Sequence, residues 1–271
     1  MRHTSIILLF FLAFQLSVKA YKQHVLTSKN IAKADTVWVF TPSTYDENPP
    51  KKYPMVYLLH GWSGNYHQWN DIMDCQAYSD RYGFILVCPD GLYDSWYINS
   101  PAKEQSQFAT FFFSDLMPFV EKNYRQDPEN IFITGLSMGG HGALYLFASK
   151  PELFRSAGSL SGVLDLTDWL DSYSIKDYLG ITGKKTGSDR LKAFSVTGNI
   201  KSIAESGKEI IISCGSADEF LGINNDFKTK CDDAKIKATY ITGPGKHDYS
   251  YWESAIGYQF IFFENMVSYK K

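Results

Sequence analysis

One serine in this chain stands in a setting that can turn a hydroxyl into a nucleophile. Ser137 is the centre of residues 135–139, G-L-S-M-G, a G-x-S-x-G pattern. Residues 130–134 before it are mostly β-branched or aromatic, as in a buried strand, and residues 143–148 after it are strong helix formers. A sharp turn between a strand and a helix exposes the serine, and the flanking glycines let the two elements approach closely. We therefore predict that Ser137 is a catalytic nucleophile.

A serine hydroxyl needs a base, usually a histidine that is itself oriented by a carboxylate. In enzymes whose nucleophile lies on such a turn, the acid and then the histidine follow the serine along the chain. Of the six histidines, only His141 and His247 follow Ser137, and His141 is too close to leave room for an acid-bearing strand. His247, in the Gly- and Pro-rich residues 243–249, is therefore the candidate base.

The acid is expected just after the strand that precedes this histidine loop. Asp218 follows the apolar run 210–214, and the chain between it and the histidine has room for one helix and one strand. Asp218 is our first choice for the orienting carboxylate. Asp165 is the second choice. Glu219 and Asp248 are acidic residues next to Asp218 and His247 in the sequence, and either can be mistaken for the orienting carboxylate.

The tetrahedral intermediate of such chemistry needs two backbone N–H donors, which form an oxyanion hole. One is expected from Met138, the residue after the nucleophile, and the other from a loop after an earlier strand. The strand end 58–59 is followed by His60, Gly61 and Trp62. We assign the second donor to the Trp62 N–H, with Gly61 as the alternative, and we expect His60 to support the loop by hydrogen bonding.

The elements that must position these residues alternate between strands and helices. A polar–apolar alternation over 36–40 predicts an antiparallel edge strand paired with residues 24–31. Continuous apolar runs follow at 55–59, 84–88, 131–133, 157–160, 209–213 and 238–241. Stretches long enough for helices, such as 108–124, separate them. This pattern predicts an α/β fold with a mainly parallel central sheet, helices on both faces and an antiparallel N-terminal edge.

Residues 163–207 interrupt the alternation. The segment is polar, with scattered aromatic residues, and it lies between two predicted strands. Ligands bind at the C-terminal ends of the strands in open α/β sheets. We therefore expect an insertion near the active site.

The N-terminus reads as an export signal. A basic start, an apolar run over 6–16 and small residues at 18–20 are typical of a cleavable signal peptide spanning residues 1–20. The run is too short for a permanent membrane span, so we expect no stable membrane insertion; an uncleaved anchor is the alternative. The mature chain, 21–271, is then a single domain that is secreted or periplasmic.

Composition narrows the choice of partners. A net charge of −2 offers no electrostatic attraction for nucleic acid. The four cysteines show no metal-binding spacing, and no metal or other cofactor is expected. Cys88 and Cys214 lie in strand-like runs, as buried thiols do. Because export permits disulfide formation, one disulfide is the alternative.

Four segments together resemble the putative esterase family of α/β-hydrolases: 57–61, 135–140, 214–218 and 245–252. The family includes feruloyl, acetyl-xylan and tributyrin esterases, S-formylglutathione hydrolases and mycolyltransferases. The resemblance spans nearly the whole mature chain and implies the α/β-hydrolase fold. It also implies metal-free catalysis by Ser137, Asp218 and His247. Residues 94–101 look like the segment that borders the acyl pocket in small-ester members.

These features lead to the hypothesis of an exported serine carboxylesterase that hydrolyses feruloyl or acetyl esters. The ester is expected to be a small molecule or to be linked to plant polysaccharide. Aromatic side chains that can stack on a feruloyl ring or a sugar, or fill the core, are Trp62, Trp69, Trp96, Tyr97, Tyr249, Tyr251 and Trp252. Of these we expect Trp96, Tyr97, Tyr249 and Trp252 to contact substrate. The alternatives are a general short-chain carboxylesterase, an acyltransferase, or a carbohydrate-binding protein that has kept the fold without turnover.

Overall fold

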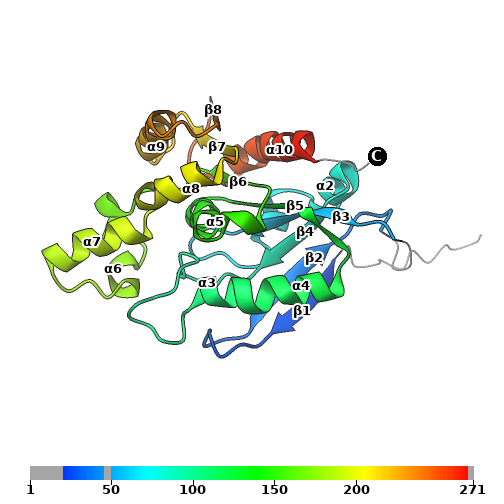
Figure 1. Cartoon of the computed structure of the whole chain (residues 1–271), viewed down its shortest axis with the longest axis horizontal. Coiled ribbons are helices and arrows are strands. Elements are labelled where there is room, and N and C mark those ends of the chain that lie inside the picture. The colour runs from blue at the N-terminus through cyan, green and yellow to red at the C-terminus, as the bar shows by residue number, and fades with distance from the viewer. Residues whose placement is uncertain (1–20, 46–49, 268–271) are drawn as a thin grey trace, which may run out of the picture.

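A single eight-stranded sheet forms the centre of the molecule (Figure 1). The structure is a computed structural model and describes residues 21–45 and 50–267; the expected signal peptide lies outside the described residues. In spatial order the strands are β1 (Lys22–Leu26), β2 (Asp35–Phe40), β4 (Ile85–Pro89), β3 (Tyr53–Leu59), β5 (Gln126–Gly135), β6 (Ser156–Leu160), β7 (Ile210–Gly215) and β8 (Ala238–Gly243). β1 and β2 pair antiparallel with their neighbours, and every later pairing is parallel. The predicted fold class is confirmed.

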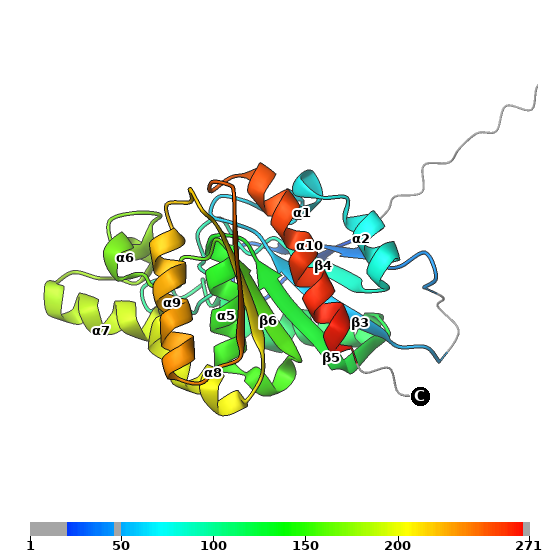
Figure 2. The same cartoon turned by 90° about the horizontal axis from the view of Figure 1, so that it is seen from above.

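The sheet is covered on both faces because its strands alternate side chains between two cores. Met55, Tyr57 and Leu59 of β3 enter one core, whereas Val56 and Leu58 enter the other. Helices α1 (Gln68–Ile72), α2 (Cys75–Tyr82) and α10 (Tyr249–Met266) cover the second face, as Figure 2 shows from above. The first face carries α3 (Phe108–Phe111), the π-helical turn η1 (Phe112–Leu116), α4 (Met117–Asn123), α5 (Met138–Ser149), α8 (Ile200–Ser206) and α9 (Leu221–Asp233).

The expected elements differ from the observed ones mainly at their ends. β1 ends at Leu26, five residues before the end of the expected run 24–31. The expected helix over 108–124 consists of α3, η1 and α4, so its backbone passes through a π-helical turn.

The segment 163–207 follows β6 and consists of short helices. They are η3 (Thr167–Trp169), α6 (Ile175–Tyr178), α7 (Lys184–Phe194), η4 (Thr197–Asn199) and α8. α6 and α7 lie together at one end of the molecule in both Figures 1 and 2. The loop before α6 returns toward the C-terminal ends of the strands, because Tyr173 packs its ring on Trp62, which follows β3.

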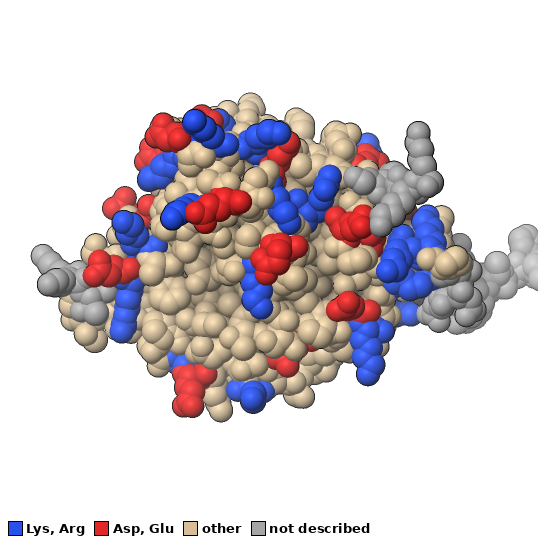
Figure 3. Space-filling model, in the orientation of Figure 1, with Lys and Arg blue, Asp and Glu red and all other residues tan. Residues whose placement is uncertain are grey.

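The charged surface, the cysteines and the helices of the described residues show no special feature. Lys and Arg are interspersed with Asp and Glu over the face seen in Figure 3, in keeping with the small net charge. All four cysteines are free and buried. Within 21–45 and 50–267, no helix has the length and apolar character to cross a membrane, and no group of His, Cys, Asp and Glu is arranged to hold a metal ion.

Candidate active site

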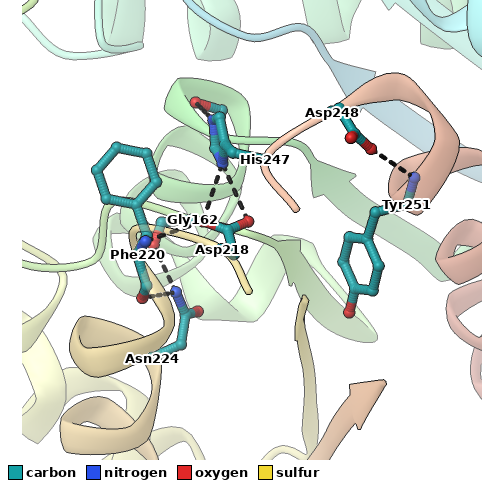
Figure 4. Close-up of polar contacts among 8 residues, drawn as sticks. Gly162, Asp218, Phe220, Asn224, His247, Asp248 and Tyr251 are labelled. Carbon is teal, nitrogen blue, oxygen red and sulfur yellow. Dashed lines mark hydrogen bonds and ion pairs between the residues drawn. The ribbon is translucent and has the colours of Figure 1, made fainter. Parts of the chain in front are cut away.

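The structure brings Ser137, His247 and Asp218 together at the C-terminal edge of the sheet. Ser137 lies between β5 and α5, Asp218 follows β7, and His247 follows β8; because these strands run parallel, their C-terminal ends meet at one edge. The His247 Nε2 atom lies 2.9 Å from Ser137 Oγ. On the other side of the ring, Nδ1 lies 3.1 Å from Asp218 Oδ2 and 3.2 Å from Oδ1 (Figure 4). One imidazole thus bridges the hydroxyl and the carboxylate.

The turn that carries Ser137 is strained and tightly packed. Ser137 has φ 54° and ψ −118°, a conformation that is costly for a residue with a side chain. A Cβ on Gly135 would lie 2.4 Å from the carbonyl oxygen of Gly139, and a Cβ on Gly139 would lie 2.2 Å from that of Leu59. Glycine is therefore required at both flanking positions, and the backbone packing forces the serine outward.

Asp218 is held in a buried and well-bonded position. Its carboxylate is inaccessible to solvent, and Oδ1 also accepts a hydrogen bond of 2.8 Å from the Phe220 N–H (Figure 4). Burial alone would raise the pKa of this carboxyl, but hydrogen bonds from His247 and the Phe220 N–H help to bring it below its ordinary value. Asn224 supports the loop by donating to the carbonyl oxygens of Gly162 and Phe220. The carboxylate therefore stays ionised beside the histidine.

Aromatic rings hold the imidazole of His247 from two sides. Phe220 contacts it edge-on at a centroid distance of 4.7 Å, and Trp252 does so at 4.9 Å. The His247 side chain is 19% exposed, so the ring is mostly enclosed but still reaches the surface.

The other acids considered from the sequence have different partners. Asp165 accepts hydrogen bonds from Thr167 and Thr197 in the 163–207 segment. Asp248 caps helix α10 by accepting from the Tyr251 N–H at 3.0 Å (Figure 4). Asp218 is the carboxylate at the histidine.

In the loop after β3, the N–H assigned as second donor, that of Trp62, differs in its hydrogen bonding from the alternative, that of Gly61. The Gly61 N–H donates to Gln68 Oε1 at 2.8 Å, so it is already engaged. Over the described residues, neither the Trp62 N–H nor the Met138 N–H, at the start of α5, donates to another protein group. His60 is buried, and its ring lies within hydrogen-bonding distance of the carbonyl oxygens of Gly61 and Asp90. Burial lowers the pKa of His60 to about 4, so the ring is neutral and supports the loop.

Two of the expected substrate contacts prove to be core residues. Trp96 and Tyr97 are 1% and 0% exposed, because their backbone turns inward with φ 51° and 59°. The Tyr97 hydroxyl donates to the His60 carbonyl oxygen, and the ring fills the space that Gly142 leaves on α5. Their expected contact with substrate is corrected: both side chains are enclosed by protein and offer almost no accessible surface.

The other two candidates lie at the site. Trp252 packs behind His247 and is 6% exposed, whereas Tyr249 is 47% exposed. Tyr249 also packs against Trp252, at a centroid distance of 5.8 Å. Tyr249 is thus the more accessible of the two.

Aromatic residues that the sequence did not assign to the site connect the loop after β3 with His247. Tyr173 contacts Trp62 at 5.6 Å and Phe220 at 6.4 Å, so it joins the loop after β3 to the loop that bears Asp218. Trp169 packs on Phe220 at 4.6 Å, and Tyr93 packs on Trp62 at 5.0 Å. We call the set the aromatic rim: Tyr93, Trp62, Tyr173, Trp169, Phe220, Trp252 and Tyr249. The aromatic content of the polar 163–207 segment was the available signal for Trp169 and Tyr173; Phe220 had none beyond its nearness to Asp218.

A mostly parallel sheet with a serine at a strand–helix turn, and with an acid and a histidine at later strand ends, defines an α/β-hydrolase. The comparisons with known proteins agree. The chain belongs to the putative esterase family, which matches residues 28–263. It is a carboxylic ester hydrolase.

Relatives of this chain include several kinds of esterase. An acetyl esterase of Caldicellulosiruptor saccharolyticus is 28% identical over 86% of this chain and 94% of its own length. An endo-1,4-beta-xylanase/feruloyl esterase of Xylanibacter ruminicola is 27% identical over 74% of this chain and 29% of its own length. Among solved structures, FphF, a fluorophosphonate-binding serine hydrolase of Staphylococcus aureus, has the same fold. It superposes with a TM-score of 0.79 at 21% identity and covers 91% of this chain and 98% of its own.

Proposed function

We propose that this esterase uses Ser137 as nucleophile, His247 as general base and acid, and Asp218 as the orienting carboxylate. Ser137 Oγ attacks the ester carbonyl carbon while His247 Nε2 takes the hydroxyl proton. Asp218 accepts the Nδ1–H, which fixes the tautomer and stabilises the imidazolium that forms. The alcohol then leaves with the proton from Nε2, and water cleaves the acyl-enzyme by the same steps. The 2.9 Å and 3.1 Å separations along this relay support the assignment.

The negative oxygen of each tetrahedral intermediate is bound by the N–H groups of Met138 and Trp62. The engagement of the Gly61 N–H by Gln68 supports Trp62 over Gly61 as the second donor. Each such donor is worth about 3–4 kcal/mol to the transition state.

We propose an aromatic acyl group, of the feruloyl type, as the preferred substrate. The observation that carries this choice is the aromatic rim, because its rings continue from Trp62 through Tyr173 and Phe220 to His247, and aromatic side chains beside the base offer packing partners to another ring. The feruloyl esterase among the relatives supports the same choice. Polysaccharide is the expected carrier of the ester, and the proposed signal peptide implies that the enzyme works outside the cytoplasm.

Acetyl esters are the second candidate. The acetyl esterase matches over most of both chains, which favours a small acyl group. A small acyl group would leave the rim without a ring to bind, so the two candidates differ in whether the rim contributes to turnover.

Methyl ferulate and methyl acetate test the choice, since they share the alcohol and differ in the acyl group. We expect kcat/KM for methyl ferulate to exceed that for methyl acetate by about tenfold or more, from one to two ring contacts. Replacing Tyr173 by alanine should remove most of this preference, whereas Tyr258→Ala, a substitution of an exposed tyrosine on α10, should not. Ser137→Ala should abolish both activities. A preference for methyl acetate that Tyr173→Ala leaves unchanged would refute the feruloyl assignment.

A further inference from the structure

The side chain of Gln68 is built into the loop that carries the Trp62 N–H. Gln68 is the first residue of α1, and its Oε1 atom accepts the Gly61 N–H at 2.8 Å. A Cβ placed on Gly64 would lie 2.7 Å from the same oxygen. The carboxamide therefore occupies the hollow between Gly61 and Gly64, inside the turn that the Gly64 N–H closes by donating to the Gly61 carbonyl oxygen.

Gly61 itself lies against the nucleophile. A Cβ at this position would lie 3.5 Å from the Cβ of Ser137 and 2.7 Å from Cδ1 of Leu136. Any rotation of the Gly61 backbone would therefore change the geometry immediately beside the reacting hydroxyl.

The two peptide planes on either side of Gly61 have different partners. The Gly61 carbonyl, which shares its plane with the Trp62 N–H, accepts from the Gly64 N–H at 3.0 Å and lies 2.7 Å from His60 Nδ1. The Gly61 N–H, in the preceding plane, is bound by Gln68. Glycine has little intrinsic preference for one backbone conformation, so external partners must supply the order.

We propose that Gln68 is a positioning residue that fixes the loop 61–64 and thereby aims the Trp62 N–H at the oxyanion. The proposal rests on the serine mechanism proposed above. Gln68 Nε2 also donates to the Tyr249 hydroxyl at 3.1 Å, and Tyr249 is two residues after His247. A single carboxamide thus contacts both the loop proposed to stabilise the oxyanion and the first residue of α10, the helix that follows the base.

Gln68→Met tests the role, because methionine keeps the length of the side chain but cannot replace the amide oxygen. We expect kcat to fall about 10–100-fold, a part of what the loss of a whole oxyanion donor costs, with KM within about threefold of the wild type. Gln68→Ala, which also removes the acceptor and suits a helix, should give the same split. Gln76→Met on α2 is the matched control, because Gln76 binds the Thr41 carbonyl oxygen at 3.0 Å, outside the site.

The inhibition constant Ki of phenylboronic acid is a measurement that a general loss of stability would not change. This compound adds to a nucleophilic serine as a tetrahedral adduct, and one boron oxygen takes the place of the oxyanion. Its Ki should rise in Gln68→Met by the factor by which kcat/KM falls, and should stay constant in Gln76→Met. A folded Gln68→Met protein with unchanged kcat and unchanged Ki would overturn the proposal. Absence of all ester turnover in the wild type would instead overturn the proposed function.

Discussion

Replacing Asp218 by asparagine tests the relay by exchanging a single oxygen for an amide nitrogen. The structure determines which way the new amide turns: the Phe220 N–H, 2.8 Å from Oδ1, requires an acceptor there. The NH₂ group must then take the Oδ2 position, 3.1 Å from His247 Nδ1. An N–H donor at that place forces Nδ1 to be the acceptor and moves the ring proton to Nε2, where it faces Ser137 Oγ. His247 then cannot take the serine proton.

The expected loss in kcat is about 10⁴-fold, the scale of such a tautomer change in a Ser-His-Asp site, and corresponds to about 5 kcal/mol. Hydrolysis of p-nitrophenyl acetate measures it, and thermal melting checks that the fold persists. Asp165→Asn is the matched control, since it makes the same chemical change at an acid bonded to Thr167 and Thr197, and its kcat should stay within about threefold. A folded Asp218→Asn enzyme within about tenfold of the wild-type kcat would refute the assignment, as would an equal loss in Asp165→Asn.

Two further predictions concern the support of the site. Burial, with a contribution from Asp90, raises the pKa of the Asp35 carboxyl from 3.8 to about 8, so the folded state favours the protonated form. The contribution of this carboxyl to the free energy of unfolding is therefore complete below pH 3.8 and is lost as the pH rises toward 8. Urea unfolding at pH 5, 6 and 7 should show the stability of the wild type falling relative to Asp35→Asn by about 1.4 kcal/mol per pH unit; parallel pH curves would contradict this. Gly139→Ala should lower kcat by about 100-fold, because the new Cβ would lie 2.2 Å from the Leu59 carbonyl oxygen. Gly222→Ala on α9 is the control: its Cβ would meet open space, so kcat should stay the same and the free energy of unfolding should rise by about 0.5–1 kcal/mol. Wild-type turnover by Gly139→Ala would contradict the close-packing argument.

The parts of this protein that could be predicted from the sequence are those that local pattern and chain order determine. Continuous apolar runs identified the parallel strands, because strands buried on both faces tolerate few polar residues. Chain order left one histidine, His247, and strand position selected Asp218 from the acids. The structure places both within hydrogen-bonding distance of each other.

What could not be predicted depends on contacts between distant segments. The place in the loop favours Trp62 over Gly61 as donor, but the contact that engages the Gly61 N–H comes from Gln68, which no motif connects with an oxyanion hole. The inward turn of Trp96 and Tyr97 depends on consecutive left-handed backbone conformations that neither residue type favours. Phe220 and Tyr173 meet only because the 163–207 segment folds back over the strand ends.

The burial of Trp96 gives this residue an indirect connection to the site. Its Nε1–H donates to the carbonyl oxygen of Tyr173 at 3.1 Å, and Tyr173 and Ser174 both have positive φ. Such a strained pair persists only where its surroundings determine it, and the buried indole supplies one of the required contacts.

His141 supplies a second anchor for the same segment. It lies on α5, shortly after Ser137, and its Nε2 atom is 2.8 Å from the Phe194 carbonyl oxygen at the end of α7. Burial lowers the pKa of His141 to about 4, so the ring is neutral, and the edge of Trp96 packs on it at 5.4 Å. The segment that contributes Trp169 and Tyr173 to the aromatic rim is thus attached to the helix that begins at the nucleophile. An aromatic rim anchored in this way keeps its rings in place relative to α5 and to His247, which is what the proposed discrimination between a flat aromatic acyl group and an acetyl group requires.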